Sequence, residues 1–202
     1  MSGRQFVSGM TAAVLALAVV SAQSLPASPD GKAQAQVGGS VKDGKWLEIS
    51  YSRPILRGRT NIFGSGATYG ESLLAGAPVW RAGANVTTRL RTEAALVIGG
   101  KTVAPGEYSV FIDLKEGGWT FILSSWDAQT KYDPNNKAAL WGAYGYTADK
   151  DVARVPMKLD KLAYEVDQLT WAFVDMKNTG GRIALMWGNT MASTPFTAVA
   201  SR

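Results

Sequence analysis

Apolar and polar residues alternate along most of the chain beyond residue 40. In residues 45–51 (KWLEISY), Leu47, Ile49 and Tyr51 fall on one face and Trp46, Glu48 and Ser50 on the other. A period of two residues predicts a half-buried β-strand. The same alternation recurs at residues 107–114, 119–125, 152–159, 168–176 and 181–188.

Two of these segments predict a hairpin. Residues 107–114 and 119–125 are separated only by a short loop containing the turn signal Glu116-Gly117-Gly118, which favours an antiparallel pair. Just before them, Pro105-Gly106 predicts a turn and Tyr108 follows it at the start of a strand. A tyrosine at such a corner can return its hydroxyl to the backbone, and we expect this structural role for Tyr108.

The sequence offers one candidate for helix, a single turn within residues 158–169 (KLDKLAYEVDQL). Eight to ten short strands joined by Gly-rich turns instead predict an all-β protein. The expected architecture is a single antiparallel β-sandwich of Greek-key or jelly-roll type, with the packed domain spanning residues 40–202.

The N-terminal residues have the pattern of a secretory signal peptide over residues 1–22. Arg4 precedes the short apolar run 11–20, and Val20 and Ala22 suit the −3 and −1 positions of a cleavage site. A retained membrane anchor is the alternative, although the run is shorter than the roughly 20 residues of a spanning helix. Residues 23–39 read as a flexible leader. We therefore expect a periplasmic or extracellular protein with no transmembrane segment in its mature chain.

The absence of histidine and cysteine excludes several chemistries. Without either residue type the chain has no Ser-His-Asp triad, no Cys-His pair, no zinc site of the usual kind and no disulfide. We expect no metal and no cofactor. The formal net charge is +5, from 21 Lys and Arg against 16 Asp and Glu. These basic residues are scattered, so nucleic acid is not an expected partner.

Several loops combine guanidinium groups with aromatic rings, and the binding residues that we predict lie there. Forked donors and flat rings in Gly-rich loops suit a ligand such as a small anion or a sugar, whereas the structural alternative is a strand exit or a packed loop. The aromatic loop 140–146 in particular could form a carbohydrate platform. The predicted binding residues are Arg53, Arg59, Trp80, Arg81, Asn85, Trp141 and Tyr144.

A series of ordered motifs carries a family resemblance. "YSRP", "RGRTNIFG", "YGE", "VWRAGAN", "PGEYSVF", "WTFIL" and "WGAYGY" with "DVARVPM" follow one another between about residues 45 and 187. This series resembles the bacterial family called domain of unknown function 2911, and it implies an exported β-rich protein without an assigned activity. Residues 72–78 (SLLAGAP) separate the "YGE" and Trp-Arg motifs here, as an apparent insertion relative to the family pattern.

Three functions are consistent with these features. The expected function is a non-catalytic β-sandwich that binds an unknown small molecule, a carbohydrate or an envelope protein. A purely structural role in the cell envelope is the second. The third is a carboxylate-dependent hydrolase acting on envelope or extracellular glycans, with Glu71 as its expected participant because Glu71 lies among the family motifs.

Overall fold

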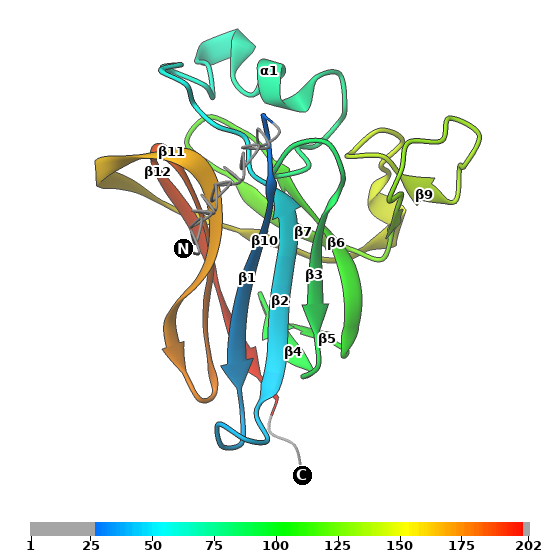
Figure 1. Ribbon diagram of the computed structural model, residues 1–202, viewed down its shortest axis with the longest axis vertical. Coiled ribbons are helices and arrows are strands. Elements are labelled where there is room, and N and C mark those ends of the chain that lie inside the picture. Colours follow the sequence, from blue (N-terminus) through cyan, green and yellow to red (C-terminus); the bar gives the residue numbers. More distant parts are fainter. Residues whose placement is uncertain (1–26, 200–202) are drawn as a thin grey trace, which may run out of the picture.

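A computed structural model describes residues 27–199, so the predicted signal peptide lies outside the described residues. Two antiparallel sheets dominate it (Figure 1). The larger sheet has the strand order β1 (Asp30–Val37), β2 (Lys45–Ser52), β3 (Thr88–Thr92), β6 (Gly106–Asp113), β7 (Thr120–Ser124) and β10 (Asp151–Pro156). The smaller has the order β11 (Lys158–Lys177), β12 (Gly180–Ala198), β4 (Leu96–Ile98) and β5 (Lys101–Val103).

The remaining elements are short. A parallel pair is formed by β8 (Asp127–Ala128) and β9 (Ala139–Leu140). The helical elements are α1 (Glu71–Leu74) and two 3₁₀ turns, Gly66–Thr68 and Ala148–Lys150. None of the helices in residues 27–199 is long and apolar enough to cross a membrane.

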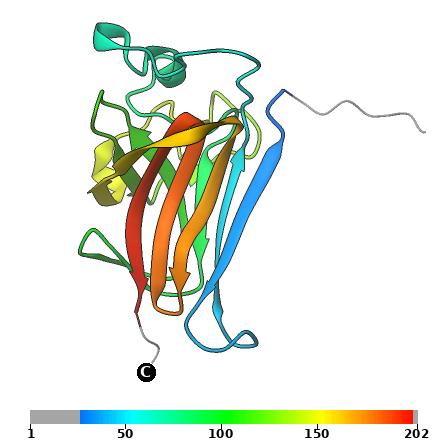
Figure 2. The same ribbon diagram turned by 90° about the vertical axis from the view of Figure 1, so that its left-hand side faces the viewer.

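The predicted β-sandwich is confirmed, with ten strands in its two main sheets. Leu47 and Ile49 of β2, predicted to point inward, are fully buried. They belong to one hydrophobic core with Trp171 and Ile183 of the facing sheet. Figure 2 shows β11 and β12 side by side along the height of this second sheet. Burial of apolar side chains between the two sheets is the main stabilising contribution in a chain without disulfides.

Four aromatic side chains form the densest part of the core. Trp80 and Trp187 stack with ring centroids 6.1 Å apart, and Trp119 meets Trp80 edge-on at 6.2 Å. Phe63 completes the group, 4.8 Å from Trp119. These four residues are called the buried aromatic cluster below. Phe63 lies in a loop, Trp80 forms a bridge with Ile112, Trp119 directly precedes β7 and Trp187 lies on β12, so the cluster joins distant parts of the chain.

The two local predictions around residue 110 are also confirmed. β6 and β7 pair as an antiparallel hairpin, with Ile112 opposite Phe121. The Tyr108 hydroxyl donates to the carbonyl oxygen of Ala104 at 2.9 Å, which fixes the corner before β6.

Two predicted segments differ from the structure. Residues 158–169 form no helical turn but the first part of β11. The register of its pairing with β12 shifts between Lys161 and Val166. This irregularity interrupts the alternation of apolar and polar residues, so the apolar residues have a spacing that resembles that of a helix. The predicted leader 23–39 is not flexible throughout, because residues 30–37 form β1. Small residues such as Ala33 and Ala35 fill the inner face of this edge strand and gave a weak apolar signal.

A second, smaller core lies on the outer face of the larger sheet. Phe111 of β6 and Ile122 of β7 point away from the sandwich interior and are fully buried. The loops that cover them contribute Val79, Leu140 and Tyr146. The segment from β8 to β10 is thereby fixed onto the sheet, and this segment carries the candidate site.

Candidate functional site

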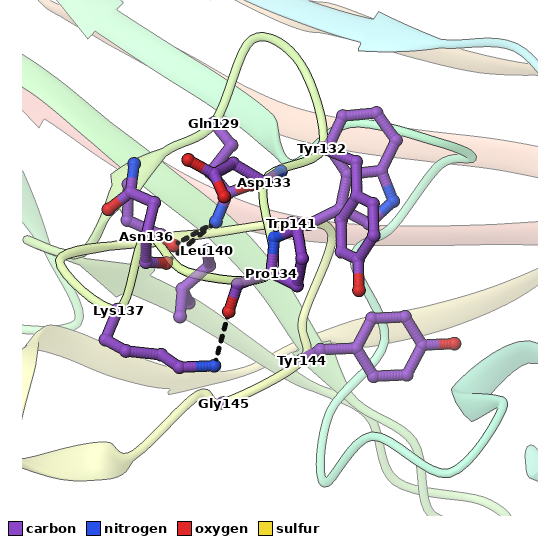
Figure 3. Close-up of a pocket in the computed structure, with 11 residues that line it drawn as sticks. Gln129, Tyr132, Asp133, Pro134, Asn136, Lys137, Leu140, Trp141, Tyr144 and Gly145 are labelled. Atoms are coloured by element: carbon purple, nitrogen blue, oxygen red, sulfur yellow. Dashed lines mark hydrogen bonds between the residues drawn. The ribbon is translucent and has the colours of Figure 1, made fainter.

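Three aromatic side chains gather where the loop after β8 meets the loop after β9. Tyr132, Trp141 and Tyr144 line an open hollow of about 380 Å³. The same rings border an adjoining pocket of about 350 Å³, called the polar pocket below because its lining includes the polar side chains of Gln129, Asp133, Asn136 and Lys137 (Figure 3). We call these three rings the exposed aromatic site.

The rings of this site are available to a ligand. Tyr132 is 59% exposed and Tyr144 is 46% exposed, whereas Trp141 is half-buried. The Tyr132 and Trp141 rings lie 5.9 Å apart between centroids and are tilted by 59°. Exposed aromatic rings grouped around one hollow make this surface the candidate functional site.

Arg81 supports the site from behind. Its guanidinium lies 5.2 Å from the centre of the Tyr144 ring, and Nη1 donates to the carbonyl oxygen of Asn85 at 2.8 Å. Gly142 leaves the space that this arrangement needs, because a Cβ there would lie 2.5 Å from Cζ of Arg81. Asn85 adopts the left-handed backbone conformation (φ 56°), which asparagine tolerates better than most residues. Asn85 therefore shapes the turn and presents its carbonyl to Arg81.

The segment 72–78, the apparent insertion in the motif series, also contacts the site. The Tyr144 hydroxyl donates to the carbonyl oxygen of Ala75 at 3.2 Å. Ala77, two residues later, belongs to the small outer core together with Leu140. The inserted residues thus help to orient the ring of Tyr144.

The loop between β8 and β9 is fixed by one buried amide. Gln129 donates through Nε2 to the carbonyl oxygens of Asn136 and Ala139, both at 2.9 Å, and its Oε1 accepts the backbone N–H of Asp133 at 2.8 Å. The next loop is held by the buried Thr87 hydroxyl, which lies 2.7 Å from the carbonyl oxygen of Gly142. Such ties leave the site largely pre-formed, which lowers the entropic cost of binding.

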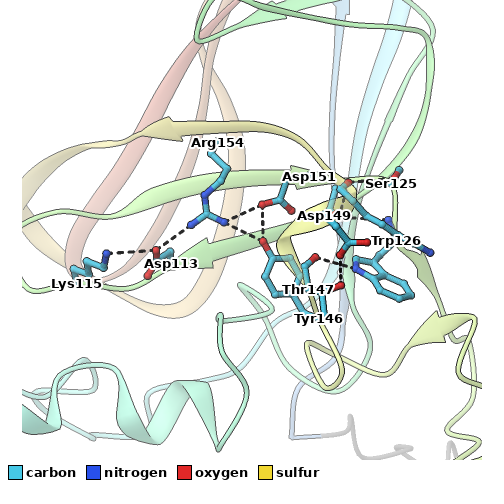
Figure 4. Close-up of polar contacts among 11 residues, drawn as sticks. Asp113, Lys115, Ser125, Trp126, Tyr146, Thr147, Asp149, Asp151 and Arg154 are labelled. Atoms are coloured by element: carbon cyan, nitrogen blue, oxygen red, sulfur yellow. Dashed lines mark hydrogen bonds and ion pairs between the residues drawn. The ribbon is translucent and has the colours of Figure 1, made fainter.

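A polar network anchors the end of the same segment (Figure 4). Tyr146 donates to Oδ2 of Asp151 at 2.6 Å, and Arg154 donates to the same oxygen at 2.9 Å. Arg154 also pairs with Asp113 of β6 at 3.1 Å. Burial, together with the hydrogen bond to Asp151, raises the pKa of Tyr146 well above its usual value. The phenol therefore stays protonated and continues to donate at neutral and moderately alkaline pH.

Four of the seven predicted binding residues come together here: Arg81, Asn85, Trp141 and Tyr144. Trp80 does not join them, although it precedes Arg81 in sequence. It is 1% exposed within the buried aromatic cluster, because its backbone pairs with Ile112 and directs the ring inward. The prediction that Trp80 contacts a ligand is therefore wrong, because the side chain is buried. The role of Trp80 is structural.

Arg53 and Arg59 also lie apart from the site and bond to the backbone. Arg53 Nε donates to the carbonyl oxygen of Leu169 at 3.4 Å, which ties the end of β2 to β11. Arg59 donates to the carbonyl oxygens of Leu56 and Ile55 at 3.0 and 2.7 Å and lies over the Trp187 ring at 5.8 Å. Arg59 therefore closes a local loop, whereas Arg53 links two segments that are distant in the chain, and both side chains have structural roles.

Sequence reasoning missed Tyr132 and Lys137. Both lie in a polar stretch, residues 127–137, which contains no glycine and therefore differs from the Gly-rich loops that supplied the predicted binding residues. No group of three or more acidic side chains positioned for a metal ion occurs in residues 27–199. A tyrosine within a polar turn, where no strand periodicity places it in a core, was the signal that could have identified Tyr132.

Acidic residues gather at a different hollow. Glu71 is exposed at the first position of α1. Asp30, Glu107 and Asp127 instead line a hollow of about 630 Å³ beside the outer face of the larger sheet. Glu107 is engaged there by Arg89, whose Nε lies 3.0 Å from Oε1.

The fold and the site together define an all-β sandwich with an aromatic-lined hollow on loops outside one sheet. The chain belongs to the family described as protein of unknown function (DUF2911), whose sequence model matches residues 28–196. That match begins before β1 and extends into β12, further in both directions than the motif series. No curated protein and no solved structure matches the chain.

Proposed function

We propose that the protein is an exported, non-catalytic carbohydrate-binding protein and that the exposed aromatic site is where the sugar binds. One observation carries the proposal: Tyr132, Trp141 and Tyr144 surround one open hollow that has a polar pocket beside it. Sugar rings present flat C–H faces that pack on aromatic rings, and their hydroxyl groups need nearby polar partners.

The polar pocket supplies such partners. Asn136 uses Oδ1 to accept the backbone N–H of Ala138 at 3.1 Å, while its Nδ2 has no partner among residues 27–199. The Lys137 ammonium bonds one carbonyl oxygen, that of Pro134, at 2.6 Å, which leaves two of its three protons for a ligand. Free donors beside exposed rings suit a polyhydroxylated ligand better than a purely apolar one.

Export is supported by the pattern of residues 1–22 and is tested separately. In the native host, mass spectrometry of the mature protein is expected to find Gln23 at its N-terminus, in the periplasmic or extracellular fraction. Recovery of the uncleaved chain from the cytoplasm would contradict this part of the proposal.

A glycan array tests the binding function. The purified protein is expected to bind at least one glycan class, with affinity then measured by calorimetry. Tyr132→Ala removes an exposed ring and should weaken binding about tenfold, since a lost aromatic contact is worth roughly 1 kcal/mol or more. Trp141→Ala should have a larger effect because the indole is the largest of the three ring systems.

Tyr164→Ala is the matched control. Tyr164 is 60% exposed, close to the 59% of Tyr132, but it lies on β11 and lines neither hollow of the site. Its substitution should leave affinity unchanged. Absence of any glycan binding, or an equal loss in the Tyr164 variant, would contradict the proposal.

The carboxylate-dependent hydrolase is the alternative function that the structure gives an observation for, because three acids line the larger hollow. It predicts that glycans incubated with the protein release new reducing ends. Turnover that Glu107→Gln abolishes, in a variant that still folds, would overturn the non-catalytic proposal.

A further inference from the structure

The charges around the exposed aromatic site point to the class of sugar. We infer that this site selects acidic glycans, which carry carboxylate or sulfate groups, and that Lys137 is the residue that binds the anion. This inference rests on the proposed carbohydrate-binding function and adds to it a charge on the ligand.

Lys137 is the central observation. Its side chain lines the polar pocket, and Figure 3 shows it extended along the loop toward Pro134. The ammonium makes no ion pair with a described acidic residue, and its one bond in residues 27–199 is to a neutral carbonyl. A lysine held against a pocket wall without a directly paired carboxylate presents an ammonium group that an entering anion can bind.

One carboxylate, that of Asp133, lines the same pocket but is engaged by the loop itself. Its Oδ1 accepts the backbone N–H of Asn135 at 2.9 Å, which closes the turn. The backbone of Asp133 is fixed in turn by Gln129. No ion pair within 4.0 Å joins Asp133 to Lys137, so the lysine is not neutralised by direct pairing.

A second cation lies against one of the aromatic rings, that of Tyr144. Arg81 stacks against Tyr144 and donates to the neutral carbonyl of Asn85, and no described acid pairs with it. The two cations thus lie near the pocket and the rings, in a chain whose formal net charge is +5. A positive site on a positively charged protein attracts anions over several ångströms and increases their association rate.

The energetics favour an anion over a neutral hydroxyl at Lys137. A charge-assisted hydrogen bond between ammonium and carboxylate is roughly twice as strong as a neutral one. A neutral sugar also leaves the ammonium partly desolvated without a compensating charge, whereas an acidic sugar supplies that charge. The aromatic side chains then provide affinity for the sugar ring, and Lys137 provides selectivity for its acid group.

An array with matched pairs tests this inference. It carries tetragalacturonate beside tetragalactose, tetramannuronate beside tetramannose, and a sulfated galactan beside its desulfated form. The expected result is binding to the acidic member of at least one pair, at least about tenfold tighter than to its neutral partner. The carboxylate and sulfate arms distinguish the two sources of negative charge.

Lys137→Met is the diagnostic variant, because it keeps the aliphatic length and removes the charge. It should bind the acidic glycan about tenfold more weakly and lose most of the salt dependence that the parent protein shows. Lys131→Met is its matched control: Lys131 is exposed in the same loop but does not line the pocket. This variant should bind as the parent does.

The outcomes separate the two proposals. Equal binding to acidic and neutral members, or an unchanged Lys137→Met variant, would overturn the inference and leave carbohydrate binding intact. Failure to bind every glycan on the array would overturn carbohydrate binding itself. A loss shared equally by the Lys131 and Lys137 variants would show a non-specific charge effect and would also overturn the assigned role of Lys137.

Discussion

Aromatic side chains concentrate at two places in this protein, and the two groups differ in what surrounds them. The buried aromatic cluster packs Trp80, Trp119 and Trp187 edge-on and face-on with Phe63 between the sheets. The exposed aromatic site presents its rings to solvent over loops, at distances that leave an open hollow. Residue type is therefore a poor guide to role: the same tryptophan and tyrosine side chains stabilise the fold in one place and are available to a ligand in the other.

The contrast follows from the backbone. Trp80 is next to Arg81, yet pairing between Trp80 and Ile112 turns one residue inward and leaves the other on the surface. At the exposed site the loops are anchored by other residues, Gln129, Thr87 and Tyr146, so the three rings are not needed to fill a core. Rings that a fold does not use for packing are free to bind.

The largest effect on stability is expected from Trp80→Ala. Removing a fully buried tryptophan from the cluster should lower the free energy of unfolding by about 3–5 kcal/mol, because the neighbouring rings cannot collapse into the space. Urea denaturation followed by circular dichroism measures this loss. A loss below about 1 kcal/mol would contradict the contrast between the two groups, since that is the scale of ordinary substitutions.

A smaller loss of stability, which depends on pH, is expected from Tyr146→Phe. The hydroxyl of Tyr146 anchors the site segment to Asp151, and a hydrogen bond to a charged group contributes about 1.5–3 kcal/mol to stability. Because burial and Asp151 raise the pKa of Tyr146, the folded chain keeps this proton at a pH where the unfolded chain loses it, above about pH 10. The stabilisation is therefore present below pH 10 and decreases as the pH rises further.

The measurement is the difference in unfolding free energy between parent and Tyr146→Phe across this pH range. The difference should be constant near neutral pH and should shrink above about pH 10, because only the parent has this phenol to ionise. A difference that remains constant to about pH 11 would contradict the raised pKa. The variant should also weaken glycan binding modestly, since Tyr146 holds the segment that carries Trp141 and Tyr144.

The fold was predictable because it depends on alternation, which is a local property. Leu47 and Ile49 face the core where the period of two places them, and the turn near Gly117 forms the expected hairpin. The predictions were wrong where alternation is interrupted, at the shift after Lys161, or is carried by small residues, as in β1. A bulge and an alanine-rich edge strand leave little hydrophobic signal.

The site was predictable only in part because it depends on contacts between loops. Trp141, Tyr144 and Arg81 were identified from residue types in Gly-rich loops, but their grouping depends on the approach of Arg81 to Gly142, 61 positions apart in the chain (142 − 81). Nothing in the local sequence separates the buried Trp80 from the half-buried Trp141. Lys137 acquires significance only from the three-dimensional structure, in which it has no acidic partner among residues 27–199.

The smallest effect on stability, and the sharpest separation of the two groups, is expected from Tyr132→Ala. Because the ring is 59% exposed, its removal should change the free energy of unfolding by no more than about 0.5 kcal/mol. Tyr164→Ala, at 60% exposure, should change stability equally little. The two variants should nevertheless differ in glycan affinity, which only the Tyr132 variant loses. Thermal unfolding and calorimetry on the same samples measure both quantities. If Tyr132→Ala instead destabilised the protein by several kcal/mol, its ring would be part of the packing, and the distinction between a stabilising cluster and a binding site would fail.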